Sequence, residues 1–247
     1  MKIRLAIAML IVLSSTTAHA SDANTTDEIG RWLHQRALQA AVEDSGSGVL
    51  RNATESGTYR VLPLNLLDAP EVAKTQLRAD IDRVRSGVVQ LPDGVIPTQQ
   101  ALLAGLPRTI RSNAELRHRL PSAPSNLQAT PLGAAELIGM EPSGALDGVR
   151  SSGLTRYYRL DGVGIVEFSE DNYRAAGTRI EVIEEAQNVS VNGLPAQLQL
   201  SIDGHGRNRV ELSWATAEKS HSLIAIGEGD VRHSERLIQA IASNVID

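Results

Sequence analysis

The stretch VSVNGLPAQLQLSIDGHGRNRVELSWATAEKSHSLIAI, residues 189–226, decides the fold of this 247-residue chain. Apolar residues alternate with polar ones over residues 196–202 and again over 210–214, a pattern typical of strands with one buried and one wet face. The dipeptide Asn192-Gly193 is the preferred sequence of a two-residue hairpin turn. The stretch therefore predicts an antiparallel meander of hairpins.

The alternation also predicts how the two longest strands of this stretch pair. Residues that lie directly opposite each other share a face of the sheet, so the even-numbered apolar residues of both strands must meet. This requires an odd number of residues in the connecting loop, and the five residues 203–207 meet the requirement. The expected pairs are Leu200 with Val210, Leu198 with Leu212, and Ala196 with Trp214.

The next strand, residues 220–226, extends the same pattern. Pairing Leu212 with Leu223 places His221 opposite Trp214. We expect Trp214 to lie in the core, because large aromatic side chains dominate core burial. His221 is then expected to be a partly buried histidine at the edge of the core, packed beside the indole and without a catalytic role.

Two further elements flank this meander. Residues 156–160 and 163–168 surround Asp161-Gly162, a strong signal for a two-residue turn. In that register Leu160 lies opposite Val163, Tyr158 opposite Ile165, and Arg156 opposite Glu167. A helical apolar stripe over residues 237–245 follows the strands. Strands joined by hairpins and closed by a helix predict an α+β fold, in which an antiparallel sheet carries a C-terminal helix on one face.

Residues 21–120 predict a mainly helical region before the sheet. Capping boxes, in which Ser or Thr is followed three residues later by Glu, mark helix starts at Thr25 and Ser112, and the first of these helices is expected to extend to residue 42. Residues 68–87 carry an apolar stripe at helical spacing, and residues 97–104 fit a short helix.

Two stretches of the first 153 residues do not fit helices. Residues 59–67 are apolar but contain Pro63, which favours an edge strand. Residues 121–153 contain four prolines, with several Gly and Ser residues, and these interrupt every periodic pattern. We expect them to form a connection between domains or a long loop over a surface. Residues 154–247 then form the domain made of the sheet and the C-terminal helix.

The first 20 residues predict a cleavable secretory signal peptide. Lys2 and Arg4 precede nine apolar residues, 5–13, and Ala18-His19-Ala20 matches the small-x-small pattern of a cleavage site. Nine residues span about 13 Å as a helix, whereas a bilayer core needs about 20 apolar residues. We therefore expect export to the periplasm with cleavage after Ala20, and no membrane span.

Composition narrows the class of partner. The formal net charge is −5 and the chain has no cysteine. An acidic balance argues against nucleic acid as the main partner. Without cysteine, folding does not depend on disulfide formation. We expect a protein partner or a small ligand in the cell envelope, with no cofactor, no metal and no nucleic acid, and the oligomeric state is left open.

A search of the sequence for local catalytic motifs finds no nucleophile elbow Gly-x-Ser-x-Gly, no zinc motif His-Glu-x-x-His and no phosphate-binding glycine loop. A zinc site would need histidines from distant segments. The neighbouring carboxylates Glu167, Glu170 and Asp171 would serve acid–base chemistry only with a raised pKa in an apolar pocket. Their polar neighbours in the sequence predict exposure instead.

Two groups of side chains are candidates for binding. Asp203, His205 and Arg207 fall at a predicted hairpin tip, and loops on a rigid sheet often carry binding groups; the alternative is a solvated turn. A basic cluster could meet an acidic partner, or could be a solvated helix face. This cluster consists of Arg108, Arg111, Arg117 and Arg119, with His118 among them.

The C-terminal pattern also resembles a known kind of domain. Its marks are the turn Val191-Asn192-Gly193, the pair Pro195-Ala196, the strand end Leu212-x-Trp214, and Glu235-Arg236-Leu237-Ile238 with Ala242 in the closing helix. On these marks, residues 154–246 are similar to the uncharacterised extracytoplasmic domains of bacterial lipoproteins and of membrane proteins associated with anti-sigma factors. The resemblance implies a non-enzymatic module located in the envelope, and it names no ligand.

Together these patterns predict a soluble, non-catalytic binding or interaction module of the periplasm, of the inhibitor, immunity or envelope-sensing type. One alternative is a periplasmic hydrolase whose Ser, His and Asp residues converge from distant segments. A second alternative is a structural component of an envelope assembly. The lack of a local catalytic motif in the sequence favours binding over catalysis.

Overall fold

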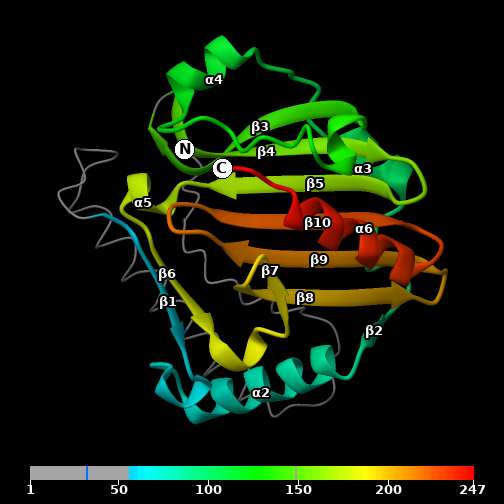
Figure 1. The fold of residues 1–247 in the computed structure, drawn as a ribbon. Coiled ribbons are helices and arrows are strands. Elements are labelled where there is room, and N and C mark those ends of the chain that lie inside the picture. The colour runs from blue at the N-terminus through cyan, green and yellow to red at the C-terminus, as the bar shows by residue number, and fades with distance from the viewer. Residues whose placement is uncertain (1–31, 33–55, 148) are drawn as a thin grey trace.

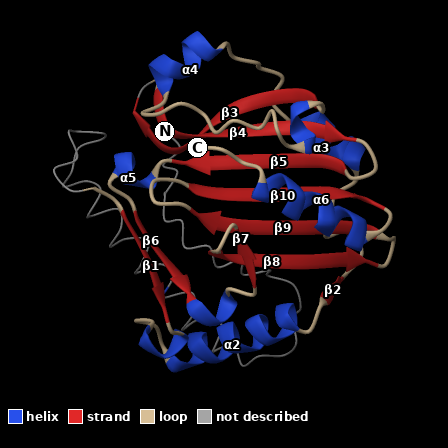
Figure 2. Cartoon of the chain, viewed as in Figure 1, coloured by secondary structure: helices blue, strands red, loops and turns tan. Residues whose placement is uncertain are grey.

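The structure is a computed structural model that describes residue 32, residues 56–147 and residues 149–247. Its centre is an eight-stranded, mostly antiparallel sheet (Figure 1). The C-terminal helix α6 (Val231–Ser243) lies across one face of this sheet (Figure 2). The predicted α+β class, an antiparallel sheet with a C-terminal helix, is therefore confirmed.

The order of strands in the main sheet differs from their order in the chain. One neighbouring pair, β2 with β8, is parallel, and the other described pairs are antiparallel. From one edge to the other the strands are β2 (Val88–Leu91), β8 (Leu194–Asp203), β9 (Arg207–Ala215), β10 (Ser220–Glu228), β5 (Gly164–Asp171), β4 (Arg150–Leu160) and β3 (Glu136–Asp147), and β7 (Val189–Val191) also pairs with β8.

The register of β8, β9 and β10 is the predicted one. The pairs are Leu200 with Val210, Leu198 with Leu212, Ala196 with Trp214, and Trp214 with His221. The rings of Trp214 and His221 stack with their centroids 4.8 Å apart. His221 is fully buried rather than partly buried as expected. At the predicted two-residue turn, Asn192 and Gly193 both have positive φ, which this type of turn requires.

The main core lies between the sheet and α6. The helix begins after Asp230, whose side chain accepts the Arg232 N–H as an N-cap. Its apolar stripe places Ile238 and Ile241 against the sheet, and both side chains are fully buried. Full burial of a Leu, Ile or Phe side chain stabilises a fold by about 1.5–3 kcal/mol. The helix is therefore held mainly by this one face.

The hairpin between β4 and β5 has a different register from the predicted one. The observed pairs are Leu160 with Gly164, Tyr158 with Val166, and Arg156 with Phe168. Val163 donates its N–H to the Leu160 carbonyl but is left out of the ladder as an extra loop residue. This shift by one residue puts Val166 and Phe168, both fully buried, on the face that α6 covers. Core burial therefore outweighs the turn preference of Asp-Gly.

The prediction of a connection or loop over residues 121–153 is wrong for its second half. Residues Glu136–Asp147 form the edge strand β3, and β4 begins at Arg150. Pro142 is tolerated because an edge strand has one side without a ladder partner, so its missing N–H breaks no hydrogen bond there. Earlier in the stretch, η2 (Pro131–Gly133) is a single 3-10 turn capped by Thr130.

Four further helices and a strand precede or follow parts of the main sheet in the described chain. These are β1 (Thr58–Leu62), α2 (Glu71–Arg85), α3 (Gln99–Gly105), α4 (Asn113–Arg119) and α5 (Tyr173–Ala176). The expected strand over residues 59–67 corresponds to β1, which pairs parallel with β6 (Arg179–Ile183) in a second, two-stranded sheet. The capping box at Ser112 is present at the start of α4. The helix expected over residues 25–42 lies outside the described residues except for Trp32.

A small second core joins α2 to this two-stranded sheet. It also includes two 3-10 turns, η1 (Leu64–Leu66) and η3 (Glu184–Ala186). Its buried members are Leu64, Leu67, Leu77 and Ile183. The Trp32 indole N–H donates to the Asp68 carbonyl at 3.0 Å beside it.

The signal peptide expected over residues 1–20 also lies outside the described residues. In the part of the chain that the structure describes, no helix has both the length and the apolar character needed to cross a bilayer.

Candidate functional site

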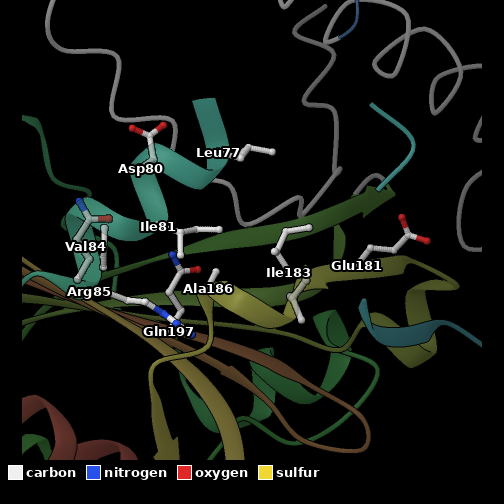
Figure 3. A pocket seen from close by; sticks show the side chains of 11 residues that line it. Leu77, Asp80, Ile81, Val84, Arg85, Glu181, Ile183, Ala186 and Gln197 are labelled. Atoms are coloured by element: carbon white, nitrogen blue, oxygen red, sulfur yellow. The ribbon is translucent and has the colours of Figure 1, made fainter. Parts of the chain in front are cut away.

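A pocket of about 620 Å³, counting its open mouth, lies between α2 and the two-stranded sheet (Figure 3). Three parts of the fold line it. α2 supplies Leu77, Asp80, Ile81, Val84 and Arg85, the β6–η3 segment supplies Glu181, Val182, Ile183 and Ala186, and β8 supplies Gln197 and Gln199. Segments more than 100 residues apart in the chain therefore build this site together.

The apolar part of the pocket follows from the spacing of α2. Leu77, Ile81 and Val84 recur every three or four residues and so share one helix face. Leu77 is buried against Ile183 in the small core, whereas Ile81 and Ala186 are only partly covered. The small core thus covers only part of the apolar face of α2. The uncovered part of this face forms one wall of the pocket.

The charged groups at the rim differ in whether they have partners. The Asp80 carboxylate lies 2.7 Å from the Arg83 guanidinium, and the Glu181 carboxylate lies 3.8 Å from that of Arg60. Among the residues that the structure describes, the side chain of Arg85 has no hydrogen bond or ion pair. Arg85 is therefore the uncompensated charge of the pocket lining.

A second polar cluster is buried on the face of the sheet that carries α6. At its centre is Glu170 of β5, whose side chain is only 4 % exposed. One carboxylate oxygen accepts from the Arg156 guanidinium at 2.8 Å. The other accepts from the Lys219 ammonium at 3.0 Å and from the Ser125 hydroxyl at 2.7 Å. Two cations and one hydroxyl thus converge on one buried carboxylate.

The same cluster continues to Asp247. The Ser125 hydroxyl lies 2.6 Å from Oδ1 of Asp247, and Nε2 of His221 lies 3.2 Å from Oδ2. The backbone of Asn126 pairs with that of Ile246 next to these contacts. Charged hydrogen bonds and a backbone bridge therefore hold two distant segments against the end of the sheet.

This cluster contains serine, histidine and aspartate, but not in the order that nucleophilic catalysis requires. In a catalytic triad the histidine lies between the serine and the carboxylate and accepts the serine proton. Here Asp247 lies between Ser125 and His221. Ser125 is also only 1 % exposed. The geometry serves packing and charge compensation rather than activation of a nucleophile.

The electrostatics of the cluster keep its carboxylates ionised. Burial alone would raise the pKa of Glu170, but the Arg156 and Lys219 cations outweigh it and hold the pKa below its usual range. Burial also acts to raise the pKa of Asp247, and hydrogen bonding and charge from His221 lower it by more. Neither carboxylate is poised to act as a general acid near neutral pH.

On the opposite face of the sheet, the carboxylates of Glu167 and Glu211 have raised pKa values. Burial raises the pKa of Glu167, and the nearby carboxylate of Glu141 adds to the effect. Burial likewise raises the pKa of Glu211, against the opposing effect of Arg209. Carboxylates in this region were expected to be exposed from their polar sequence neighbours, and this expectation is wrong for Glu170, which is buried on the α6 face.

The hairpin tip predicted as a recognition loop is organised around Asp203. This buried carboxylate accepts the N–H groups of His205 and Arg207 and also the Arg207 guanidinium at 2.8 Å. Burial would raise the pKa of Asp203, but these hydrogen bonds lower it. The exposed His205 ring lies 3.4 Å from the Asp93 carboxylate. The Asp203 carboxylate thus binds groups of its own loop. A recognition role for the hairpin tip stays a prediction.

The predicted basic cluster lies on α4 and on the segment before it. Arg108 donates to the Leu103 carbonyl and Arg119 to the Val149 carbonyl. Arg111 lies 3.7 Å from the Glu115 carboxylate. Arg117 is exposed. Three of the four arginines therefore have local contacts, and a role of the cluster toward a partner stays a prediction.

The sequence pointed to Glu170, His221 and Arg156 separately, but it did not predict that they meet in one buried cluster, and it did not predict the pocket. One signal was available for the cluster: Arg156 and Glu170 occupy even positions in strands whose other even residues face the core. Charges of opposite sign at core-facing positions of adjacent strands predict a buried ion pair. No local signal marked Arg85 or Gln197, because the pocket forms only when α2 meets β8.

The composition of the site and its likeness to known proteins bear on its identity. The described residues contain no group of three or more His, Asp or Glu side chains placed to hold a metal ion. Comparisons of the chain with protein-family models, curated proteins and solved structures found no match. The function must therefore be argued from the geometry of the site itself.

Proposed function

We propose that this chain is an exported, non-catalytic binding protein whose ligand occupies the pocket between α2 and the β6–η3 segment. The observation that carries the proposal is the make-up of this pocket: a partly covered apolar wall with an uncompensated cation at its rim. Sites for small molecules typically have apolar linings with a few polar groups that orient the ligand. The lining of this pocket has both of these properties.

The alternative of a periplasmic hydrolase has less support. The Ser, His and Asp side chains that do converge, Ser125, His221 and Asp247, have the wrong order for a triad. Ser125 and His221 are also buried, which keeps both away from a substrate. Binding is therefore the better-supported class.

Export is part of this proposal and depends on the first 20 residues. The positive start, the short apolar run and the Ala18-His19-Ala20 pattern support it. Intact-mass measurement of the protein from an osmotic-shock fraction is expected to show a chain that begins at Ser21. Recovery of the full chain, starting at Met1, from the cytosol alone would contradict export.

The binding site is tested by filling the pocket. We expect Ala186→Trp to place an indole in the apolar part, because Ala186 lines the pocket and is only partly covered. N-phenyl-1-naphthylamine, a neutral dye that brightens in apolar surroundings, serves as the probe. The variant is expected to bind the dye at least about tenfold more weakly than the wild type, since the space is occupied.

Ala104→Trp is the matched control, because Ala104 is exposed on α3 and does not line the pocket. It adds the same side chain and is expected to leave dye affinity unchanged. Thermal melting of both variants shows whether each remains folded. Equal dye affinity for the wild type and a folded Ala186→Trp variant would place dye binding elsewhere and overturn the proposed site.

A further inference from the structure

We propose that the ligand class is a small amphipathic acid, with an apolar chain against Ile81 and Ala186 and an acid group held by Arg85 and Gln197. This inference rests on the proposed function, because it takes the pocket as the site. It goes further by assigning the charge of the ligand and the residues that recognise it.

The charge balance of the pocket lining is the first argument. Asp80 and Glu181 each have an arginine partner outside the lining, Arg83 and Arg60 respectively. In Figure 3 both carboxylates point away from Ile81 and Ala186. Arg85 is left with no partner among the described residues. Arg85 is therefore the charged group of the lining that is left to pair with a ligand, and it complements an anion and disfavours a cation.

The placement of hydrogen-bond donors is the second argument. Figure 3 shows the Arg85 side chain extending toward Gln197 of β8. The Gln197 side chain, like that of Arg85, makes no hydrogen bond to the described part of the chain. A guanidinium can bind both oxygens of a carboxylate, and a side-chain amide can donate a further hydrogen bond. Arg85 and Gln197 together thus form a suitable clamp for an acid group.

The apolar wall is the third argument. Ile81 of α2 and Ala186 of η3 both line the pocket and are both only partly covered. An alkyl chain packed against them would remove apolar surface from water, which contributes about 0.8 kcal/mol for each buried CH₂ group. A fully polar anion such as inorganic phosphate would gain nothing from this surface. The pocket therefore fits an acid that carries an apolar chain.

Arg85 also has an alternative role that needs no ligand. It lies in the last turn of α2, where a cation interacts favourably with the helix dipole. Arg83 is in the same turn, but its guanidinium forms an ion pair with the Asp80 carboxylate. The two roles of Arg85 make different predictions, because a role at the helix end affects stability and not the charge preference for ligands.

The test uses three ten-carbon probes that differ only in the head group: decanoate, decanol and decyltrimethylammonium. Isothermal titration calorimetry with the purified full-length mature protein, below the micelle concentration, measures each affinity. We expect decanoate to bind at least about tenfold more tightly than decanol, and the cation to bind most weakly. Added salt is expected to weaken decanoate binding and to leave decanol binding unchanged.

Two substitutions on α2 sharpen the test. Arg85→Gln is expected to lower the decanoate affinity about tenfold and to leave the decanol affinity unchanged, because only the acid group loses a partner. Arg78→Gln is the matched control: it removes the same charge from an exposed position of the same helix outside the pocket. We expect it to change neither affinity.

The outcomes separate this inference from the proposed function. If decanoate and decanol bind equally, Arg85→Gln changes neither affinity and Ala186→Trp blocks both, the pocket is a site but the acid class is wrong. Tightest binding of the cation would also overturn the acid class. If Ala186→Trp leaves all binding intact, the pocket is not the site and both proposals fail.

Discussion

Glu167 and Glu170 lie three residues apart on the same strand, β5, yet their pKa values are shifted in opposite directions. The two side chains lie on opposite faces of the sheet. Glu170 lies on the face of the sheet that carries α6 and contacts Arg156 and Lys219, which lower its pKa despite burial. Glu167 faces the other side, where burial and the Glu141 carboxylate raise its pKa. Burial alone does not decide whether a carboxylate stabilises a fold. The deciding factor is which charged and hydrogen-bonding partners the tertiary structure places beside the carboxylate.

The largest expected effect comes from removing the charge of Glu170. Glu170→Gln leaves the Arg156 and Lys219 cations buried without their main counter-charge, and breaking a buried pair in this way typically costs about 3–5 kcal/mol. Urea denaturation at pH 7 measures the loss in the free energy of unfolding. Asp93→Asn, an exposed carboxylate change, is the control and is expected to cost less than about 0.5 kcal/mol.

The contrast between the two faces of the sheet would be contradicted if Glu170→Gln lowered the free energy of unfolding no more than Asp93→Asn does. That result would mean that water reaches the cations around Glu170 as readily as it reaches the surface. Acid titration adds a second check. Because the pKa of Glu170 is lowered in the folded state, its contribution is complete above the unfolded pKa of about 4.3 and is lost as the pH falls through the folded pKa. The wild type is therefore expected to lose stability more steeply in acid than Glu170→Gln.

The smallest expected effect has the opposite sign and concerns Glu167. Its raised folded pKa means that the ionised carboxylate opposes folding at neutral pH and that the penalty fades as the pH falls toward the unfolded pKa of about 4.3. Glu167→Gln keeps the acceptor for the Ser169 hydroxyl and removes the charge. We expect the variant to be slightly more stable than the wild type at pH 7.

Urea midpoints at pH 7 and at about pH 4 test this change. The difference between Glu167→Gln and the wild type is expected to shrink at the lower pH, because both forms are then largely uncharged. A variant that is less stable than the wild type at pH 7 would show that the Glu167 charge has a favourable partner, and the contrast between the two faces would be lost.

The same distinction between local and tertiary causes separates the predictions that are confirmed from those that are wrong. The register of β8 to β10 followed from alternation and loop parity, because each apolar residue had to face one core. The register after β4 did not follow from Asp-Gly turn chemistry. There the burial of Val166 and Phe168 added one residue to the loop. Turn preferences contribute less free energy than two buried side chains.

The edge strand β3 shows why the composition of residues 121–153 led to a wrong prediction of a connection or loop. Its residues include Pro142 and Gly144, which interrupt any periodic pattern. Such residues are tolerated because the strand lies at the edge and pairs through one side with β4. Only the presence of β4 as a neighbour turns this sequence into a strand.

The sequence by itself determined the antiparallel meander, its register around Trp214 and the C-terminal helix, because the periods of alternation and of the helical stripe are local properties of the chain. Tertiary structure alone decided the partners of Glu170, the raised pKa of Glu167 and the pocket beside α2. These depend on side chains from segments far apart in the sequence, and no local period encodes which of them will meet. The electrostatic environment of a group is set by these neighbours and by exclusion of water, both of which exist only in the folded state.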